Sequence, residues 1–172
     1  MDYTVIDLEM TGLAPKHDKV IEIGAVRVRN NMITDTYGTL VNAKLPIPPK
    51  ITELTGITDE MAASGMEEDT AMQRLLDFIG GDILVGHNLS FDYSFIKQWA
   101  VNKRIPLEIN ACDTLGIARA LLPGEQSKKL ESLCEYFQIE RENAHRALDD
   151  AIETQKIFEK LRVLGKEKEE LF

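Results

Sequence analysis

DYTVIDLEM, residues 2–10, decides the fold because it is a predicted β-strand that carries two acids on one face. Side chains alternate between the faces of a strand, so Val5, Asp7 and Glu9 point the same way. Apolar residues flank the acids, and Thr-Gly then turns the chain. Burying like charges together is unfavourable unless cations neutralise them. The strand therefore predicts a cation site, the alternative being an edge strand whose acids lie in water.

Further strands and helices follow this first strand. Two strands are predicted at residues 19–30 and 32–42, with a hairpin turn at Asn30-Asn31 between them. Short strands are predicted at residues 82–86 and 108–114. Helices are predicted near residues 51–57 and at 67–81, 88–104, 115–122, 127–137 and 144–164. This order predicts an α/β fold with a mixed five-stranded sheet, three antiparallel strands and then parallel strands, flanked by helices.

The composition limits the class of protein. At 172 residues and 44% hydrophobic content, the chain is expected to form a single domain over residues 1–172. We expect no signal peptide, no membrane span and no membrane partner. Cys112 and Cys134 fit neither a disulfide framework nor a zinc cluster, which favours a cytoplasmic setting. The net charge of −9 argues against a large basic nucleic-acid footprint, although a small metal-containing cleft remains compatible with it.

The closing helix separates two adjacent aspartates. Apolar residues at helical spacing define a core-facing stripe, and Asp150 lies on that stripe. Asp149 falls with Glu153, Lys156 and Lys160 on a face that we expect to be solvated. We therefore expect Asp150 to be functional and Asp149 to be a surface residue.

Asp92 is a third inward-pointing acid position, because it aligns with apolar residues at the start of the helix at 88–104. The alternative is that Asp92 only favours the helix N-terminus through its dipole. With Asp7, Glu9 and Asp150 it forms a set of hard oxygen ligands, which select Mg²⁺ or Mn²⁺ over zinc. Two such ions can activate a water and stabilise the leaving oxygen of a phosphodiester.

His145 is the best candidate for proton transfer among the three histidines. It lies five residues before Asp150 at the entry to the same helix, and imidazole titrates near neutral pH. The alternative is a surface histidine at a helix start. His87, at the end of an apolar strand, is expected to be structural through a hydrogen bond to backbone. His17, in a charged loop, is expected to be solvated.

Three motifs occur in order: DLEMTGL at residues 7–13, GHNLSFD at 86–92 and HRALDD at 145–150. Together they resemble the DEDDh family of 3′–5′ exonucleases, which have a ribonuclease H-like fold. The sister group carries Tyr in place of this His. The resemblance implies that His145 is the general base and that two Mg²⁺ or Mn²⁺ ions are held by Asp7, Glu9, Asp92 and Asp150.

The resemblance also implies a pocket for the terminal nucleotide, formed by Met10, Thr11, Gly12, Leu13, Thr55, Asn88 and Phe91. In this pocket Leu13 would be an apolar wedge against the last base, and Thr55 would lie near the terminal sugar. For Leu13 and Phe91 the alternative is a place in the core. Glu22 matches no ligand position and is expected to be structural.

The motifs point to two substrate classes. Met10 stands where many polymerase-type members have Thr, which makes the first motif similar to oligoribonuclease. Residues 51–61 and 112–123 look more like the proofreading exonuclease of bacterial DNA polymerase III, its epsilon subunit or the embedded version. The expected function is a metal-dependent 3′–5′ exonuclease that releases nucleoside 5′-monophosphates from single-stranded or frayed DNA ends, with a DNA polymerase as a candidate partner. The alternatives are an oligoribonuclease-like or ribonuclease T-like RNA exonuclease, a phosphodiesterase acting on nucleotides or dinucleotides, and a non-catalytic polymerase-interaction subunit.

Overall fold

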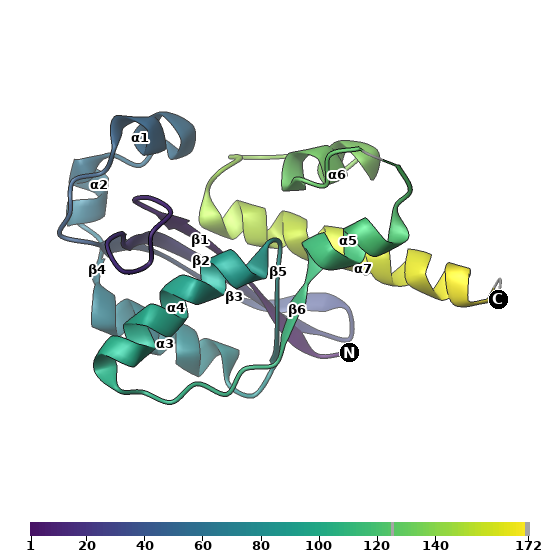
Figure 1. Ribbon diagram of the computed structural model, residues 1–172, viewed down its shortest axis with the longest axis horizontal. Helices are drawn as coiled ribbons and strands as arrows, with labels where there is room; N and C mark the ends of the chain where they lie inside the picture. Colours follow the sequence, from purple (N-terminus) through teal and green to yellow (C-terminus); the bar gives the residue numbers. More distant parts are fainter. Residues whose placement is uncertain (125, 171–172) are drawn as a thin grey trace.

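A computed structural model describes residues 1–124 and 126–170, and it contains one mixed sheet (Figure 1). The sheet has six strands in the order β4-β3-β2-β1-β5-β6. The strands are β1 (Tyr3–Met10), β2 (Val20–Arg29), β3 (Met32–Asn42), β4 (Met66–Glu67), β5 (Ile83–Gly86) and β6 (Ala111–Asp113). β1, β2 and β3 pair antiparallel, whereas β5 pairs parallel with both β1 and β6.

The predicted mixed α/β sheet is confirmed, but the count of five strands was one short. The additional strand, β4, has two residues and pairs parallel with the end of β3. A two-residue strand shows no alternation of side chains, so no sequence pattern marks it. It lies at the sheet edge far from the acids, and its omission does not change the site.

Seven helices surround the sheet in the described part of the chain. They are α1 (Pro49–Thr55), α2 (Asp59–Ala63), α3 (Glu68–Ile79), α4 (Leu89–Lys103), α5 (Thr114–Leu121), α6 (Leu130–Tyr136) and α7 (Ala147–Glu170). α7 begins three residues later than the sequence predicted and continues six residues further. None of the helices described here is both long and apolar enough to span a bilayer.

The turn between β2 and β3 follows from its two asparagines. Asn30 and Asn31 have φ angles of 51° and 66°, in the left-handed region. A two-residue hairpin turn needs this conformation, which asparagine tolerates better than most residues. The predicted hairpin is therefore confirmed, and it fixes β2 and β3 beside β1.

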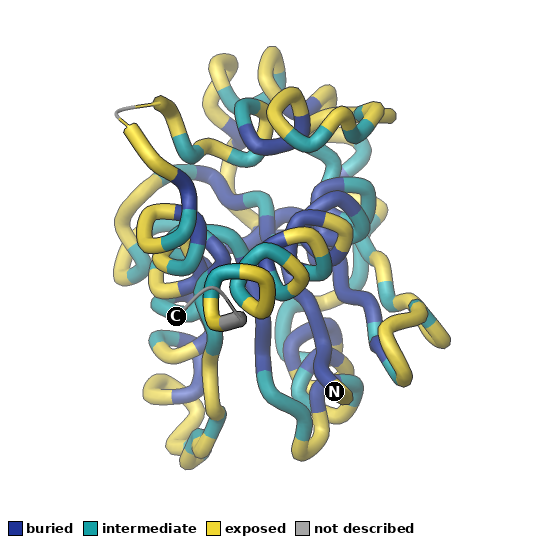
Figure 2. Tube along the Cα trace, turned by 90° about the vertical axis from the view of Figure 1, so that its right-hand side faces the viewer, coloured by how far each residue is buried: buried dark blue, intermediate teal, exposed yellow. Residues whose placement is uncertain are grey.

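The helices form one layer on each face of the sheet. Apolar residues of α3 and α4 pack with Ile6 and Leu8 of β1, whereas α7 packs with Tyr3 and Val5 on the opposite face. α5 and α6 share a further apolar cluster with α7. Figure 2 shows burial concentrated along the strands and the inner sides of the helices. Since side chains alternate, Asp7 and Glu9 continue the face of β1 on which α7 begins.

Candidate active site

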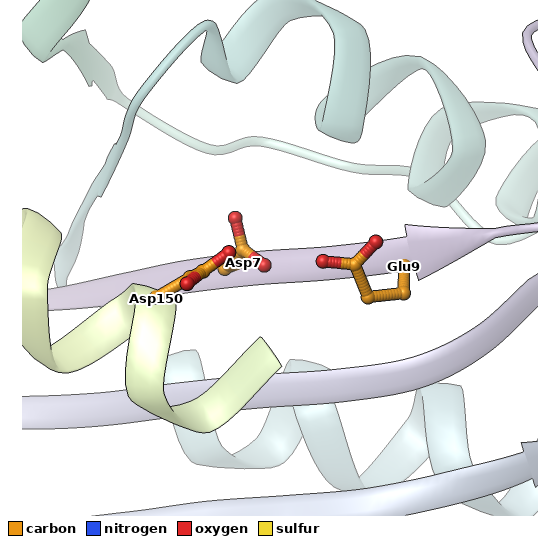
Figure 3. Close-up of side chains that lie close together, drawn as sticks. All are labelled: Asp7, Glu9 and Asp150. Atoms are coloured by element: carbon orange, nitrogen blue, oxygen red, sulfur yellow. The ribbon is translucent and has the colours of Figure 1, made fainter. Parts of the chain in front are cut away.

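Three acids predicted from the sequence lie together at the start of α7. Asp7 and Glu9 project from β1, and Asp150 projects from the first turn of α7 (Figure 3). One carboxylate oxygen of each lies within 4.8 Å of the others. Residues far apart in the sequence thus supply one compact set of oxygen ligands.

Gly24 of β2 permits this convergence. It lies opposite Asp7 in the β1–β2 ladder. A Cβ atom at position 24 would lie 2.2 Å from the carbonyl carbon of Ala147, the first residue of α7. Only glycine lets the helix start rest on the strand backbone at this separation. Asp150 is then one helical turn away and reaches Asp7.

Asp92 reaches the same place from the other layer. β1 pairs with β5 only as far as Val5 and Val85, so the later backbone of β1 is free on that side. The Leu8 N–H donates there to Oδ2 of Asp92, at 3.2 Å. Asp92 lies outside the tight group of three, but its charge contributes to the raised pKa of both Asp7 and Glu9. The hydrogen bond that its carboxylate accepts comes from β1 and not from α4, so its placement is not that of a simple helix cap.

The acids raise one another's pKa. Burial, followed by the charges of Asp150 and Asp92, raises the pKa of Glu9 to about 8. Burial also raises the pKa of Asp92 to about 8, although the Leu8 N–H opposes the shift. Burial and then Asp92, Glu9 and Asp150 raise the pKa of Asp7 well above its ordinary value. The site therefore favours positive charge, either as protons or as metal cations.

Asp7 carries the observation that best fits a metal. Its Oδ2 atom is the buried side-chain polar atom that finds no hydrogen-bond partner within the described residues. Buried oxygens without a partner are rare and costly unless an ion or water binds them. The unpaired oxygen, the neighbouring carboxylates and the raised pKa values together match the oxygen donors that Mg²⁺ and Mn²⁺ prefer.

Arg141 is a functional candidate that sequence analysis missed. Its Nη2 donates to Oδ1 of Asp150 at 3.0 Å, and its Nε donates to Oε2 of Glu153 at 2.9 Å. The expectation that Glu153 is solvated is wrong, because only 3% of this residue is exposed. The segment before α7 folds back and brings Arg141 over that face of the helix, which helical spacing alone does not reveal. Arg141 opposes the rise in the Asp150 pKa that burial causes.

His145 lies at the entry to α7 in a constrained conformation. Its φ angle is 65°, which is unusual for a non-glycine residue and is found more often at functional sites. Its backbone N–H donates to Oδ1 of Asp150 at 3.2 Å. The imidazole is half-buried and makes no hydrogen bond or ion pair to the described residues. The ring is therefore available to meet a bound water or substrate.

Glu22 fixes the start of α7, as its expected structural role requires. It stands opposite Glu9 in the β1–β2 ladder. Its carboxylate accepts from Arg146 Nη2 at 2.7 Å and from the Ala147 N–H at 2.7 Å. Both contacts join β2 to the first residues of α7. The pair holds His145 and Asp150 in register with β1.

The loop after β1 holds the four predicted nucleotide-binding residues in different settings. Thr11 is buried, and its hydroxyl donates to Asp18 at 3.0 Å. A Cβ at Gly12 would lie 2.5 Å from the same carboxylate. Leu13 is 81% exposed, so the alternative that it belongs to the core is wrong. Met10 packs in the core between the sheet and α3 and α4, on the opposite face from the acids.

The other predicted binding residues come from α1 and α4. Thr55 is buried, and its hydroxyl donates to the Ile51 carbonyl at 2.8 Å. Asn88 is exposed at the N-cap of α4 with a φ of 58°. Phe91 is half-buried, edge-on to Phe95 with ring centroids 5.5 Å apart. Nucleotide binding by these residues stays a prediction.

Comparisons with known proteins agree with this geometry. The sequence profile of the family described as "Exonuclease" (RNase_T) matches residues 4–158. The chain belongs to this exonuclease family. The predicted resemblance to 3′–5′ exonucleases is therefore confirmed at the level of the family, together with the enzyme class.

Two curated relatives place this exonuclease-family chain near bacterial replication proteins. It is 39% identical over 168 residues to DNA polymerase III PolC-type of Caldanaerobacter subterraneus subsp. tengcongensis, a match covering 95% of this chain and 12% of that protein. It is 37% identical over 160 residues to DNA polymerase III subunit epsilon of Aquifex aeolicus, covering 92% of this chain and 79% of that subunit. The chain spans about a tenth of the length of the PolC-type relatives that it matches.

A solved structure shares the fold. E. coli exonuclease I in complex with a dT13 oligonucleotide superposes with a TM-score of 0.85 at 19% identity, covering 99% of this chain and 43% of that one. At this identity the likeness concerns the fold alone. It supports the predicted ribonuclease H-like arrangement of the mixed sheet.

Proposed function

We propose that this exonuclease-family chain removes 3′-terminal nucleotides from single-stranded or frayed DNA as nucleoside 5′-monophosphates. The observation that carries the proposal is the convergence of Asp7, Glu9, Asp92 and Asp150 around an unpaired, buried Asp7 oxygen. The identity with an epsilon subunit and with PolC-type polymerases supports DNA as the substrate and a polymerase as a partner. The site residues, their roles and the identity of the metal are parts of this proposal.

The four acids would hold two Mg²⁺ or Mn²⁺ ions. Bound there, such ions supply a nucleophilic water and stabilise the departing 3′ oxygen. Arg141 and the His145 N–H fix Oδ1 of Asp150, which leaves its other oxygen for the site. The imidazole of His145 accepts the proton of the attacking water. Leu13, exposed on the loop after β1, contacts the terminal base.

The buried position of Met10 weakens the argument for RNA. The resemblance to oligoribonuclease depends on this residue, yet its side chain packs with the α3 and α4 layer. Asp7 and Glu9 project from the opposite face of β1, so the Met10 side chain does not point toward their carboxylates. The remaining alternative, a non-catalytic interaction subunit, leaves the set of four buried acids and the constrained His145 without a use.

A labelled-oligonucleotide assay tests the proposal. Single-stranded DNA and RNA oligonucleotides of matched sequence, labelled at the 5′ end, are incubated with the chain and Mn²⁺. We expect stepwise shortening of DNA, faster than RNA, and protection by a 3′-phosphate. Asp150→Asn should abolish shortening, whereas Asp149→Asn should retain it. Equal rates on the 3′-phosphorylated DNA, or equal loss in both variants, would contradict the proposal.

A further inference from the structure

A cavity of about 560 Å³ lies beside the candidate active site, between the start of α4 and the segment that joins α5 to α6. Asn88, the N-cap of α4, forms one wall, and Asp92 follows it by one helical turn. The opposite wall carries Arg119 of α5 with Lys128 and Lys129. We call this cavity the cationic groove.

The charge of the cationic groove differs from that of the rest of the chain. The chain has a net charge of −9, yet the described residues that line the groove include three cations and no acid. Four other cavities each combine cations with at least one acid. Within the described residues, Arg119, Lys128 and Lys129 also form no ion pair, whereas nine ion pairs occur elsewhere. The groove therefore concentrates unneutralised positive charge near an acidic site.

His87 fastens the cationic wall to the sheet. Its Nε2 lies 2.7 Å from the Lys128 carbonyl oxygen, and its Nδ1 lies 2.7 Å from the Thr114 hydroxyl. A carbonyl only accepts, so Nε2 carries a proton and donates. Burial lowers the pKa of His87, which favours the neutral ring. This bond confirms the structural role expected for His87 and ties the Lys128 backbone to the end of β5.

We propose that the cationic groove binds the phosphodiester backbone of the nucleotides on the 5′ side of the scissile bond. The inference rests on the proposed exonuclease function. An exonuclease holds one terminal nucleotide at the reacting end, and the remaining strand must leave the site on one side. The loop with Leu13 offers an apolar contact for a base, whereas the groove offers free cations for phosphates. Electrostatic attraction then draws the anionic strand along the wall of α5.

A double variant tests the groove. Arg119→Gln with Lys129→Gln removes two cations and leaves the Lys128 carbonyl bonded to His87. The matched control, Lys97→Gln with Lys160→Gln, removes two exposed cations from α4 and α7. We expect the groove variant to raise KM about tenfold for a dT10 oligonucleotide, from two exposed charge contacts of below 1 kcal/mol each. The control should leave KM unchanged, and kcat should change little in both.

Two further readouts separate this proposal from the exonuclease proposal. The p-nitrophenyl ester of thymidine 5′-monophosphate has no upstream phosphate, so the groove variant should hydrolyse it at the wild-type rate. The salt dependence of kcat/KM for dT10 should weaken, with a log–log slope smaller by about 1.4 for two lost phosphate contacts. Fluorescence anisotropy of labelled dT10 in EDTA should show the same loss of affinity without turnover. Equal loss on the ester, or unchanged dT10 affinity, would overturn the groove even if the exonuclease activity stands.

Discussion

Glu9→Gln should stabilise the metal-free protein, although it removes a proposed metal ligand. Glu9 is surrounded by like charges, and its pKa is raised from 4.5 to about 8. A group with a higher pKa in the folded chain makes folding less favourable as the pH rises above the unfolded value. The window for this loss is therefore pH 4.5 to 8. Glutamine keeps the shape of the side chain without its charge.

The size of the effect follows from the pKa shift. One pKa unit corresponds to 1.36 kcal/mol, so the cost at pH 7 is at most roughly 3 kcal/mol. Glu9 retains contact with solvent, which screens part of this cost, and we expect a gain of about 2 kcal/mol. For a domain of this length such a gain raises Tm by about 4–8 °C. At pH 4.5, where the unfolded carboxyl is already half protonated, the gain should be small.

Thermal unfolding in EDTA at pH 4.5 and pH 8 measures the effect. The wild-type chain should lose stability between these two values, and Glu9→Gln should lose less. Glu60→Gln, on the exposed surface of α2, is the matched control and should follow the wild type. Adding Mn²⁺ should raise the wild-type Tm and have less effect on Glu9→Gln. If Glu9→Gln were less stable than wild type in EDTA at pH 8, the acids would not repel one another as described.

Three other substitutions probe the surroundings of the acids. Gly24→Ala should displace the start of α7 and lower activity more than tenfold, at about 1–3 kcal/mol of stability, whereas Gly38→Ala, whose Cβ would meet only Leu148 Cδ2 at 3.4 Å, should be tolerated in the same assays. Arg141→Ala should cost about 3 kcal/mol in urea unfolding because it leaves two buried acids unpaired, and a cost below about 1 kcal/mol would show that the ion pairs are unimportant. His145→Ala should slow kcat by about 10²-fold or more while Mn²⁺ still raises Tm, and wild-type turnover between pH 6 and 9 would reject its role as base.

The sequence predicted the inward-facing acids because strands and helices have regular periods. The alternation of β1 placed Asp7 and Glu9 together, and helical spacing separated Asp150 from Asp149. Both inferences needed only the direction in which a side chain leaves its own element. The convergence of β1 and α7 additionally required Gly24, whose role becomes visible only when Ala147 rests on it.

The failures came from irregular segments. Glu153 lies on the face of α7 that looked solvated, but the segment before α7 covers it and supplies Arg141. No period describes that segment, so neither the burial of Glu153 nor its partner could be predicted. The positions of Leu13 and Met10 also depended on packing, because the chain turns at the end of β1.

Diffraction from crystals soaked in Mn²⁺ tests the central claim, that these carboxylates form a divalent-cation site. The account predicts an anomalous peak within about 2.0–2.3 Å of carboxylate oxygens of Asp7 and Asp150, close to the Mg²⁺–oxygen distance. It also predicts that the peak is lost in Asp150→Asn and kept in Asp149→Asn. Manganese bound only at other acidic patches, with Oδ2 of Asp7 still unpaired, would contradict it.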